Sequence, residues 1–256
     1  MYFIDTHAHL YAEEFKEDRE DMVQRTFDAG VERIYLPAID SNSHTAMLQL
    51  EADYPTRCIA MMGLHPCYVK ENVAAELEIV KQYLAERPFV AIGEIGLDLY
   101  WDKTFFEQQK HAFRTQIQWA KDLDIPIVIH TRAAMEETIA IVRAEKNERL
   151  RGIFHCFSGT LEEAQEIIEL GFMLGIGGVV TYKKAGIDLI VKDIDLQYLV
   201  LETDAPYLTP TPHRGKRNES SYLTFIAQRI AEVKEISIEE VARITSENAN
   251  HVFGFQ

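Results

Sequence analysis

Tyr2-Phe3-Ile4-Asp5-Thr6-His7-Ala8-His9-Leu10 begins as a short apolar run and ends with an acid and two histidines. Its aromatic and β-branched residues are typical of a β-strand. A doubly wound α/β sheet more often has a glycine-rich phosphate loop after its first strand. In a (β/α)8 barrel, functional side chains instead follow the C-terminal ends of the strands. The stretch therefore favours a barrel over a doubly wound sheet.

The rest of the chain repeats this order of strand, polar end and helix. Apolar bursts predict strands at residues 2–9, 33–39, 58–64, 90–98, 126–131, 152–157, 172–178 and 198–204. Helical spacing predicts helices that include residues 19–29, 74–86, 105–123, 136–146 and 162–170. Eight such units in 256 residues fit a TIM-like (β/α)8 barrel of the α/β class. Because no linker or sequence repeat divides the chain, we expect one domain over residues 1–256, with a long irregular loop at 205–221.

Charge and composition exclude several classes of protein. The chain has 41 acidic and 26 basic side chains and a net charge of -15, so a polyanion could bind only where basic residues are locally concentrated. Its longest apolar run, residues 172–180, is far too short to span a bilayer. Three cysteines without a C-x-x-C pair indicate neither a disulfide framework nor a zinc ribbon. We expect a cytoplasmic protein with no cleaved signal segment, no membrane association and no obligate protein partner.

Polar side chains at five predicted strand ends suggest a metal site. A single histidine in such a place is more often a hydrogen-bonded structural residue, so the H-x-H pair alone is weak evidence. On a strand, however, residues two apart face the same side, and a carboxylate in the apolar run 90–98 requires a partner. These imidazoles and carboxylates suit divalent Zn, Mn or Mg. The predicted ligands are His7, His9, Glu94, His130, His155 and Asp204.

Six ligands are too many for one tetrahedral zinc but suit two metal ions that share a carboxylate. We expect Glu94, the internal carboxylate of the fourth strand, to be that bridge. Two divalent ions would favour an anionic substrate although the protein as a whole is acidic. Asp204 is the candidate base for the attacking water. The expected reaction is hydrolysis of a phosphodiester.

Five colinear motifs resemble those of the TatD family, metal-dependent deoxyribonucleases of the amidohydrolase superfamily. They are Phe3-Ile4-Asp5-Thr6-His7-Ala8-His9-Leu10, Gly63-Leu64-His65-Pro66, Ile92-Gly93-Glu94-Ile95-Gly96-Leu97-Asp98, His155-Cys156-Phe157-Ser158-Gly159 and Glu202-Thr203-Asp204-Ala205-Pro206. The resemblance implies a metallo-dependent hydrolase barrel with 3'-to-5' exonuclease activity on single-stranded DNA or RNA and a possible role in DNA repair.

The same resemblance implies a role for each predicted ligand. It assigns His7 and His9 to one metal, His130 and His155 to the other, Glu94 to both, and Asp204 as ligand and base. The chain departs from the family pattern at Tyr11, Ala133 and Ser220. Since none of the three is a predicted ligand, we expect them to bear on substrate preference and not on the chemistry.

Four further residues are candidates for substrate binding: His65, Arg132, His213 and Arg214. His65 follows the third strand and is as readily a turn histidine, while Arg132 is as readily part of a structural ion pair. Basic residues near 183–184 and 213–217 follow strands seven and eight, where barrel enzymes often bind phosphate. Tyr100, Trp101 and Tyr182 have the chemistry to stack on bases, but we favour a role in covering the barrel mouth.

Three functions compete at this stage. The first is a metal-dependent nuclease or phosphodiesterase, and the second is a small-molecule amidohydrolase or deacylase with the same binuclear site. The third is a protein that binds metal or a partner without catalysis, which the presence of Asp204 disfavours. The basic loops favour the first over the second.

Overall fold

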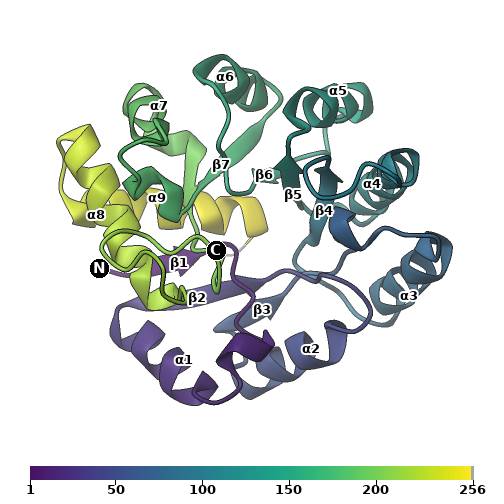
Figure 1. Ribbon diagram of the computed structural model, residues 1–256, viewed down its shortest axis with the longest axis horizontal. Helices are drawn as coiled ribbons and strands as arrows, with labels where there is room; N and C mark the ends of the chain where they lie inside the picture. The colour runs from purple at the N-terminus through teal and green to yellow at the C-terminus, as the bar shows by residue number, and fades with distance from the viewer. Residues whose placement is uncertain (255–256) are drawn as a thin grey trace.

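The computed structural model describes residues 1–254. Its strands are β1 (Phe3–Asp5), β2 (Val31–Leu36), β3 (Cys58–Ala60), β4 (Ile92–Asp98), β5 (Ile127–Arg132), β6 (Gly152–Phe154), β7 (Phe172–Ile176) and β8 (Leu199–Leu201). Its helices are α1 (Arg19–Asp28), α2 (His44–Asp53), α3 (Val73–Glu86), α4 (Phe106–Leu123), α5 (Met135–Glu145), α6 (Leu161–Glu169), α7 (Ile187–Asp193), α8 (Leu223–Lys234) and α9 (Ile238–Phe253). Figure 1 shows the helices arranged around the strands. Within residues 1–254, no helix has both the length and the apolarity that a membrane crossing requires.

Two parallel sheets form the wall of the barrel. The first has the order β1-β2-β3 and the second the order β4-β5-β6-β7-β8. An isolated parallel bridge between Met62 and Ile92 joins β3 to β4. Between β8 and β1, the Thr6 N–H donates to the Leu201 carbonyl at 3.0 Å. We call these two junctions the β3–β4 seam and the β8–β1 seam; together they close the wall, as the predicted (β/α)8 barrel requires.

The barrel interior is filled at one end by apolar side chains. Phe253 of α9 stacks on Tyr35 of β2 with ring centroids 3.8 Å apart, so α9 seals this end. The yellow α9 passes across the ring of strands in Figure 1. Functional side chains are therefore confined to the opposite end, where the strands finish. The inner layer takes one residue from or beside each strand and three from α9: Ile4, Tyr35, Met61, Ala91, Val128, Ile153, Met173, Val200, Ala249, Val252 and Phe253.

The predicted helices agree with the structure to within one residue at each end, but several predicted strands are too long. β1 ends at Asp5, so the prediction that His7 and His9 lie within the first strand is wrong. Beyond Asp5 the backbone turns toward the β8–β1 seam, where the His9 N–H donates to the Ala205 carbonyl at 2.7 Å. The segment stays hydrogen-bonded although it has left the regular ladder.

Candidate metal centre

The polar side chains at the open end follow the inner layer by two residues. His130 follows Val128 on β5, and His155 follows Ile153 just past β6. Since alternate residues of a strand face the same side, the register that buries the two aliphatic side chains also turns both imidazoles inward. Glu202 has the corresponding position just past β8.

Glu94 reaches the same layer through an irregularity in β4. The register of β4 against β5 shifts between Ile92 and Ile95, and such bulges redirect a side chain. The backbone N–H of Glu94 donates at 3.2 Å to the carbonyl of Ala38, just past β2, which ties this point of β4 to the first sheet. Its side chain is only 2% exposed. A buried carboxylate in this place requires cationic or hydrogen-bonding partners.

The two carboxylate oxygens of Glu94 face two different sets of donors. Oε2 lies 3.1 Å from His7 Nε2 and 3.5 Å from His9 Nε2. Oε1 lies 2.8 Å from His130 Nδ1 and 3.1 Å from His155 Nε2. A single side chain thus lies between two separate groups of potential ligands.

Asp204 completes the first group from across the β8–β1 seam. Its Oδ1 lies 3.7 Å from His7 Nε2 and 3.6 Å from His9 Nε2. Its backbone has a positive φ of 54°, which Asp tolerates better than most residues, and its N–H donates to the His7 carbonyl at 2.9 Å. The structure therefore brings all six predicted ligands together.

Asp5 fastens the β8–β1 seam beneath these residues. Its buried carboxylate accepts hydrogen bonds from the Thr203 N–H at 3.0 Å, the Thr203 hydroxyl at 2.6 Å and the His7 N–H at 3.2 Å. Because Thr203 immediately precedes Asp204, one side chain sets the spacing between two predicted ligands.

Tyr11 fixes the tautomer of His9. The Tyr11 hydroxyl donates to the Pro37 carbonyl at 2.5 Å, so at its 3.0 Å contact with His9 Nδ1 the tyrosine oxygen is the acceptor. His9 Nδ1 then carries the proton, and in the neutral ring the Nε2 lone pair points at Glu94 and Asp204. Tyr11, expected to bear only on substrate preference, contacts a predicted ligand directly.

Two buried carboxylates orient the histidines of the second group. Asp98 Oδ2 lies 2.9 Å from His130 Nε2, which leaves Nδ1 to face Glu94. Glu202 Oε1 lies 3.2 Å from His155 Nδ1 and accepts the Cys156 N–H. A carboxylate hydrogen-bonded to a metal-ligating histidine, as Asp98 is to His130, fixes the ring orientation. Sequence reasoning missed both acids, although each is a carboxylate at the end of an apolar strand, the signal that identified Asp204.

A glycine makes room for Glu202. A Cβ added at Gly175 on β7 would lie 2.3 Å from Glu202 Oε2, closer than real Cβ contacts allow. Any larger residue at this position would displace the carboxylate behind His155.

The charges of the site favour bound cations. Burial opposes the charged form of His9, yet Asp204 and Glu94 raise its pKa to about 10. Burial likewise opposes ionisation of Glu94, but the imidazoles of His65, His155 and His7 hold its pKa well below the usual range. The two carboxylates therefore remain ionised, and positive charge must come from bound protons or from metal ions.

The donor set fits divalent metal ions. Ligands at 2.0–2.1 Å from a tetrahedral zinc are about 3.3 Å apart, and the donor atoms around Glu94 and Asp204 have similar separations. Close groups of donors include His7 with His9 and Glu94, and Glu94 with His130 and His155. The available lone pairs of His9 and His130 point toward these groups.

His65 also reaches this cluster, but the ring nitrogen that faces the site is the one that carries the proton. Its Nδ1 accepts the Cys67 N–H at 3.0 Å, so in the neutral ring Nε2 carries the proton. That Nε2 lies 3.2 Å from Glu94 Oε1. His65 is therefore arranged as a hydrogen-bond donor toward the site. With Cys67 and His130 it forms a further group of close donor atoms.

A pocket of about 430 Å³ opens above the cluster. Its lining includes His9, Glu94 and Asp204 below and Arg132 at the side. No carboxylate of residues 1–254 pairs with Arg132, so the alternative that it forms a structural ion pair is wrong for this part of the chain. Its guanidinium instead lies over the Tyr100 ring, 3.9 Å from the centroid.

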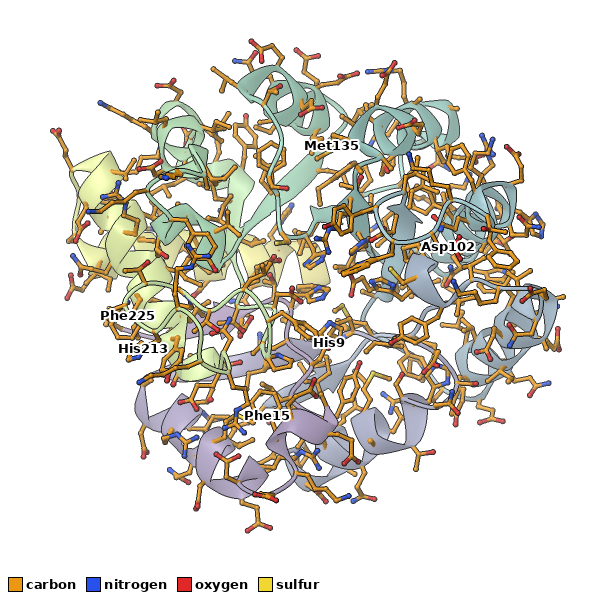
Figure 2. All side chains as sticks on the ribbon, viewed as in Figure 1. His9, Phe15, Asp102, Met135, His213 and Phe225 are labelled. Carbon is orange, nitrogen blue, oxygen red and sulfur yellow. The ribbon has the colours of Figure 1, made fainter. Side chains whose placement is uncertain are left out.

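The other two predicted substrate-binding residues lie outside this pocket. His213 stacks on Tyr222 with centroids 4.3 Å apart and contacts Phe225. Figure 2 shows His213 and Phe225 together near the edge of the molecule, away from His9. Arg214 lies over Tyr182, 3.9 Å from the ring centroid, and lines a separate hollow of about 580 Å³. Neither residue joins the metal cluster.

Comparison with known proteins agrees with this geometry. The model of the TatD related DNase family matches residues 4–254. The chain belongs to this family. YabD of Bacillus subtilis (strain 168), named an uncharacterized metal-dependent hydrolase, is 42% identical over 97% of this chain and 98% of its own length. The 3'-5' ssDNA/RNA exonuclease TatD of Escherichia fergusonii is 34% identical over 98% of both chains.

The same family likeness holds in three dimensions. The crystal structure of YJJV, a TatD homologue from Escherichia coli K12, superimposes with a TM-score of 0.92 at 31% identity over 98% of both chains. The predicted TatD resemblance and barrel fold are confirmed. The protein is a metal-dependent hydrolase of the TatD family, with candidate metal-binding groups at the C-terminal ends of its strands.

Proposed function

We propose that this TatD-family hydrolase cleaves phosphodiester bonds in single-stranded DNA or RNA, from the 3' end, with two divalent ions. One observation carries the proposal: Glu94 directs Oε2 at His7 and Oε1 at His130, the arrangement of a carboxylate shared by two metals. His9 and Asp204 would complete the first site, and His155 the second. Mg, Mn and Zn are all compatible with these ligands.

When bound, two divalent ions would supply Lewis-acid stabilisation of charge on the phosphoryl group. Side chains of the protein would supply the base and the groups that bind the phosphate. Burial raises the pKa of Asp204, but His9, His155 and His7 outweigh it and hold the pKa below its usual value, so the carboxylate is ionised, the state in which it could accept a proton from the attacking water.

Two further residues would bind the phosphate. His65 presents a proton on Nε2, and Arg132 contributes a guanidinium without a carboxylate partner. A guanidinium suits bidentate phosphate binding, while a neutral imidazole donor adds no charge. Both line the pocket above Glu94. Arg214 would contact a phosphate farther along the nucleic acid. The packing of the His213 ring against other aromatic rings disfavours the substrate-binding role predicted for His213.

The nucleic-acid substrate is supported by local positive charge in an acidic protein. Lys183, Lys184 and Arg214 line the hollow beside Tyr182. Such a groove can follow a phosphate backbone despite a net charge of -15. The name of the Escherichia fergusonii relative supports the 3'-to-5' direction and the choice of single strands. Cytoplasmic location and a role in DNA repair belong to the same proposal.

Digestion of end-labelled strands tests this function. Single-stranded DNA and RNA with a label at either end are incubated with the protein and Mg, Mn, Zn or chelator. A 3'-to-5' exonuclease releases a 3' label at once as a mononucleotide, and a 5' label persists on steadily shorter products. The Asp204→Asn variant, purified identically, controls for contaminating nucleases. Absence of cleavage with every metal, or equal cleavage by the variant, would contradict the proposal.

The amidohydrolase or deacylase alternative uses the same donor groups but requires no basic groove. It predicts hydrolysis of small amides or esters, with no activity on single strands and no effect of charge changes at Lys184. The digestion assay, repeated with those substrates, separates the two functions.

A further inference from the structure

Large aromatic side chains surround the metal-centre pocket and remain exposed. Trp101 is 69% exposed, Tyr207 50% and Tyr68 45%, and all three line the pocket. They come from the segments after β4, β8 and β3. Trp101 lies at the barrel mouth, as predicted, but most of its ring remains accessible to a ligand. Exposed aromatic surface around a pocket is typical of a ligand-binding site.

The segment that carries Trp101 is attached to the metal centre. Asp98 Oδ1 accepts the N–H groups of Tyr100 at 2.9 Å and Trp101 at 3.1 Å. Its other oxygen contacts His130. Farther along, Asp102 pairs with Lys70 at 3.0 Å. The backbone that carries the indole is therefore tied to the predicted ligands by hydrogen bonds.

Arg132 lies against this aromatic segment and lines the metal-centre pocket. Its guanidinium carbon is 3.9 Å from the Tyr100 centroid and 5.2 Å from the Trp101 centroid. Tyr100 and Trp101 contact edge to face, with ring planes at 87°. A cation that pairs with no carboxylate of residues 1–254 and an exposed indole are thus adjacent. These are the groups that recognise the two parts of a nucleotide, the phosphate by charge and the base by stacking.

We propose that Trp101 is a stacking surface for one nucleobase of a single-stranded substrate whose adjoining phosphate contacts Arg132. The proposal rests on the proposed nuclease function and adds a base-binding subsite to it. Stacking depends on the flat face that every base has, so this subsite requires a base but tolerates any sequence.

Fluorescence provides a direct test, because the chain has only two tryptophans. Trp119 lies half-buried on α4, outside the pocket, so the Trp119→Phe variant leaves Trp101 as the sole indole. The probes are a thymidine hexamer and a hexamer with abasic sugars, both with hydrolysis-resistant phosphorothioate linkages and divalent metal present. We expect the thymidine hexamer to quench Trp101 emission and the abasic hexamer to leave it nearly unchanged.

Affinity measurements with variants give an independent readout. Trp101→Ala should weaken binding of the thymidine hexamer by roughly 5- to 150-fold and leave the abasic hexamer unaffected. Trp101→Phe should restore most of the loss, since phenylalanine also stacks. Tyr198→Ala removes a similarly sized ring at the opposite end of β8 and should have no effect. Equal weakening for both hexamers, or no weakening, would overturn the proposal.

Digestion of single strands separates this proposal from the function on which it rests. If wild-type protein digests single strands and Trp101→Ala does so at the same rate with the same affinity, only the stacking proposal fails. If wild-type protein digests no single strand with any metal while it hydrolyses a small substrate, the nuclease function fails and the stacking proposal with it.

Discussion

At the metal centre most imidazoles are held by a second polar group, whereas at the rim of the pocket the cations and aromatic rings are held mainly by one another. His130 lies between Glu94 and Asp98 at 2.8 and 2.9 Å. Arg132, by contrast, lies over the Tyr100 ring, 3.9 Å from its centroid, and Trp101 is mostly exposed. The barrel thus fixes the chemistry, while the loops set what is bound and are freer to change. Substitutions in the two regions should therefore have different effects.

Glu94→Gln should have the largest effect, because a neutral amide bridges two cations poorly. We expect metal content to fall and turnover on a small phosphodiester to drop by about a thousandfold or more. Metal analysis and steady-state kinetics measure the two effects. Glu78→Gln, the same change on the exposed face of α3, is the control. Two retained ions with full activity would show that Glu94 is not the bridge.

Asp204→Asn should have the second-largest effect, with turnover reduced by about 10²- to 10⁴-fold and affinity for single strands little changed. The variant keeps the shape of the side chain and removes the proton acceptor. Kinetics and binding to a hydrolysis-resistant strand separate the two quantities. Asp193→Asn at the exposed end of α7 should be silent. An unchanged turnover would remove Asp204 from the reaction.

Asp98 contacts both the metal centre and the aromatic segment at the rim, so two substitutions of Asp98 should have different effects. Asp98→Asn keeps an oxygen for the Tyr100 and Trp101 N–H groups but loses the charge behind His130, and Asp98→Ala loses both. Each should lower metal affinity by about 10- to 100-fold. Only Asp98→Ala should also abolish the preference for thymidine over abasic hexamers. Identical behaviour of the two variants would mean that rim and centre are not separable through this residue.

Removal of positive charge from the hollow beside Tyr182 should have the smallest effect. Lys184→Ala combined with Arg214→Ala should reduce the slope of log affinity against log salt by about 0.7 for each lost phosphate contact with a single strand. Hydrolysis of a small phosphodiester should not change. Lys81→Ala with Lys192→Ala removes equal charge elsewhere on the surface and serves as the control. If both pairs change the slope equally, the hollow has no special role and only net charge matters.

The sequence predicted regular features well because their periodicity is visible. Helices such as α4 showed helical spacing, and the six predicted ligands could be found because polar residues interrupt apolar strands. The ends of β1 and β8 were misplaced because the segments beyond them hydrogen-bond across a seam, which no local pattern encodes.

Loop geometry and pairing between distant residues were beyond the sequence. His213 and Arg214 are neighbours, yet one packs against Tyr222 and the other on Tyr182. An irregular loop has no period from which side-chain directions follow. The pairing of His155 with Glu202 joins residues 47 positions apart, so it depends on the register of the closed barrel.

The predicted ligands come from both sheets of the barrel wall. Glu94 of β4 donates its backbone N–H to Ala38, just past β2 of the first sheet, and His7 and Asp204 face each other across the β8–β1 seam. Ions held there would fasten the two sheets together, and ligands that bind only the folded state oppose its opening. A cell short of divalent metal would then hold a barrel that opens more often and is exposed to proteases. The abundance of the protein would follow the metal supply, and a metal-starved cell would lose the enzyme itself as well as its activity.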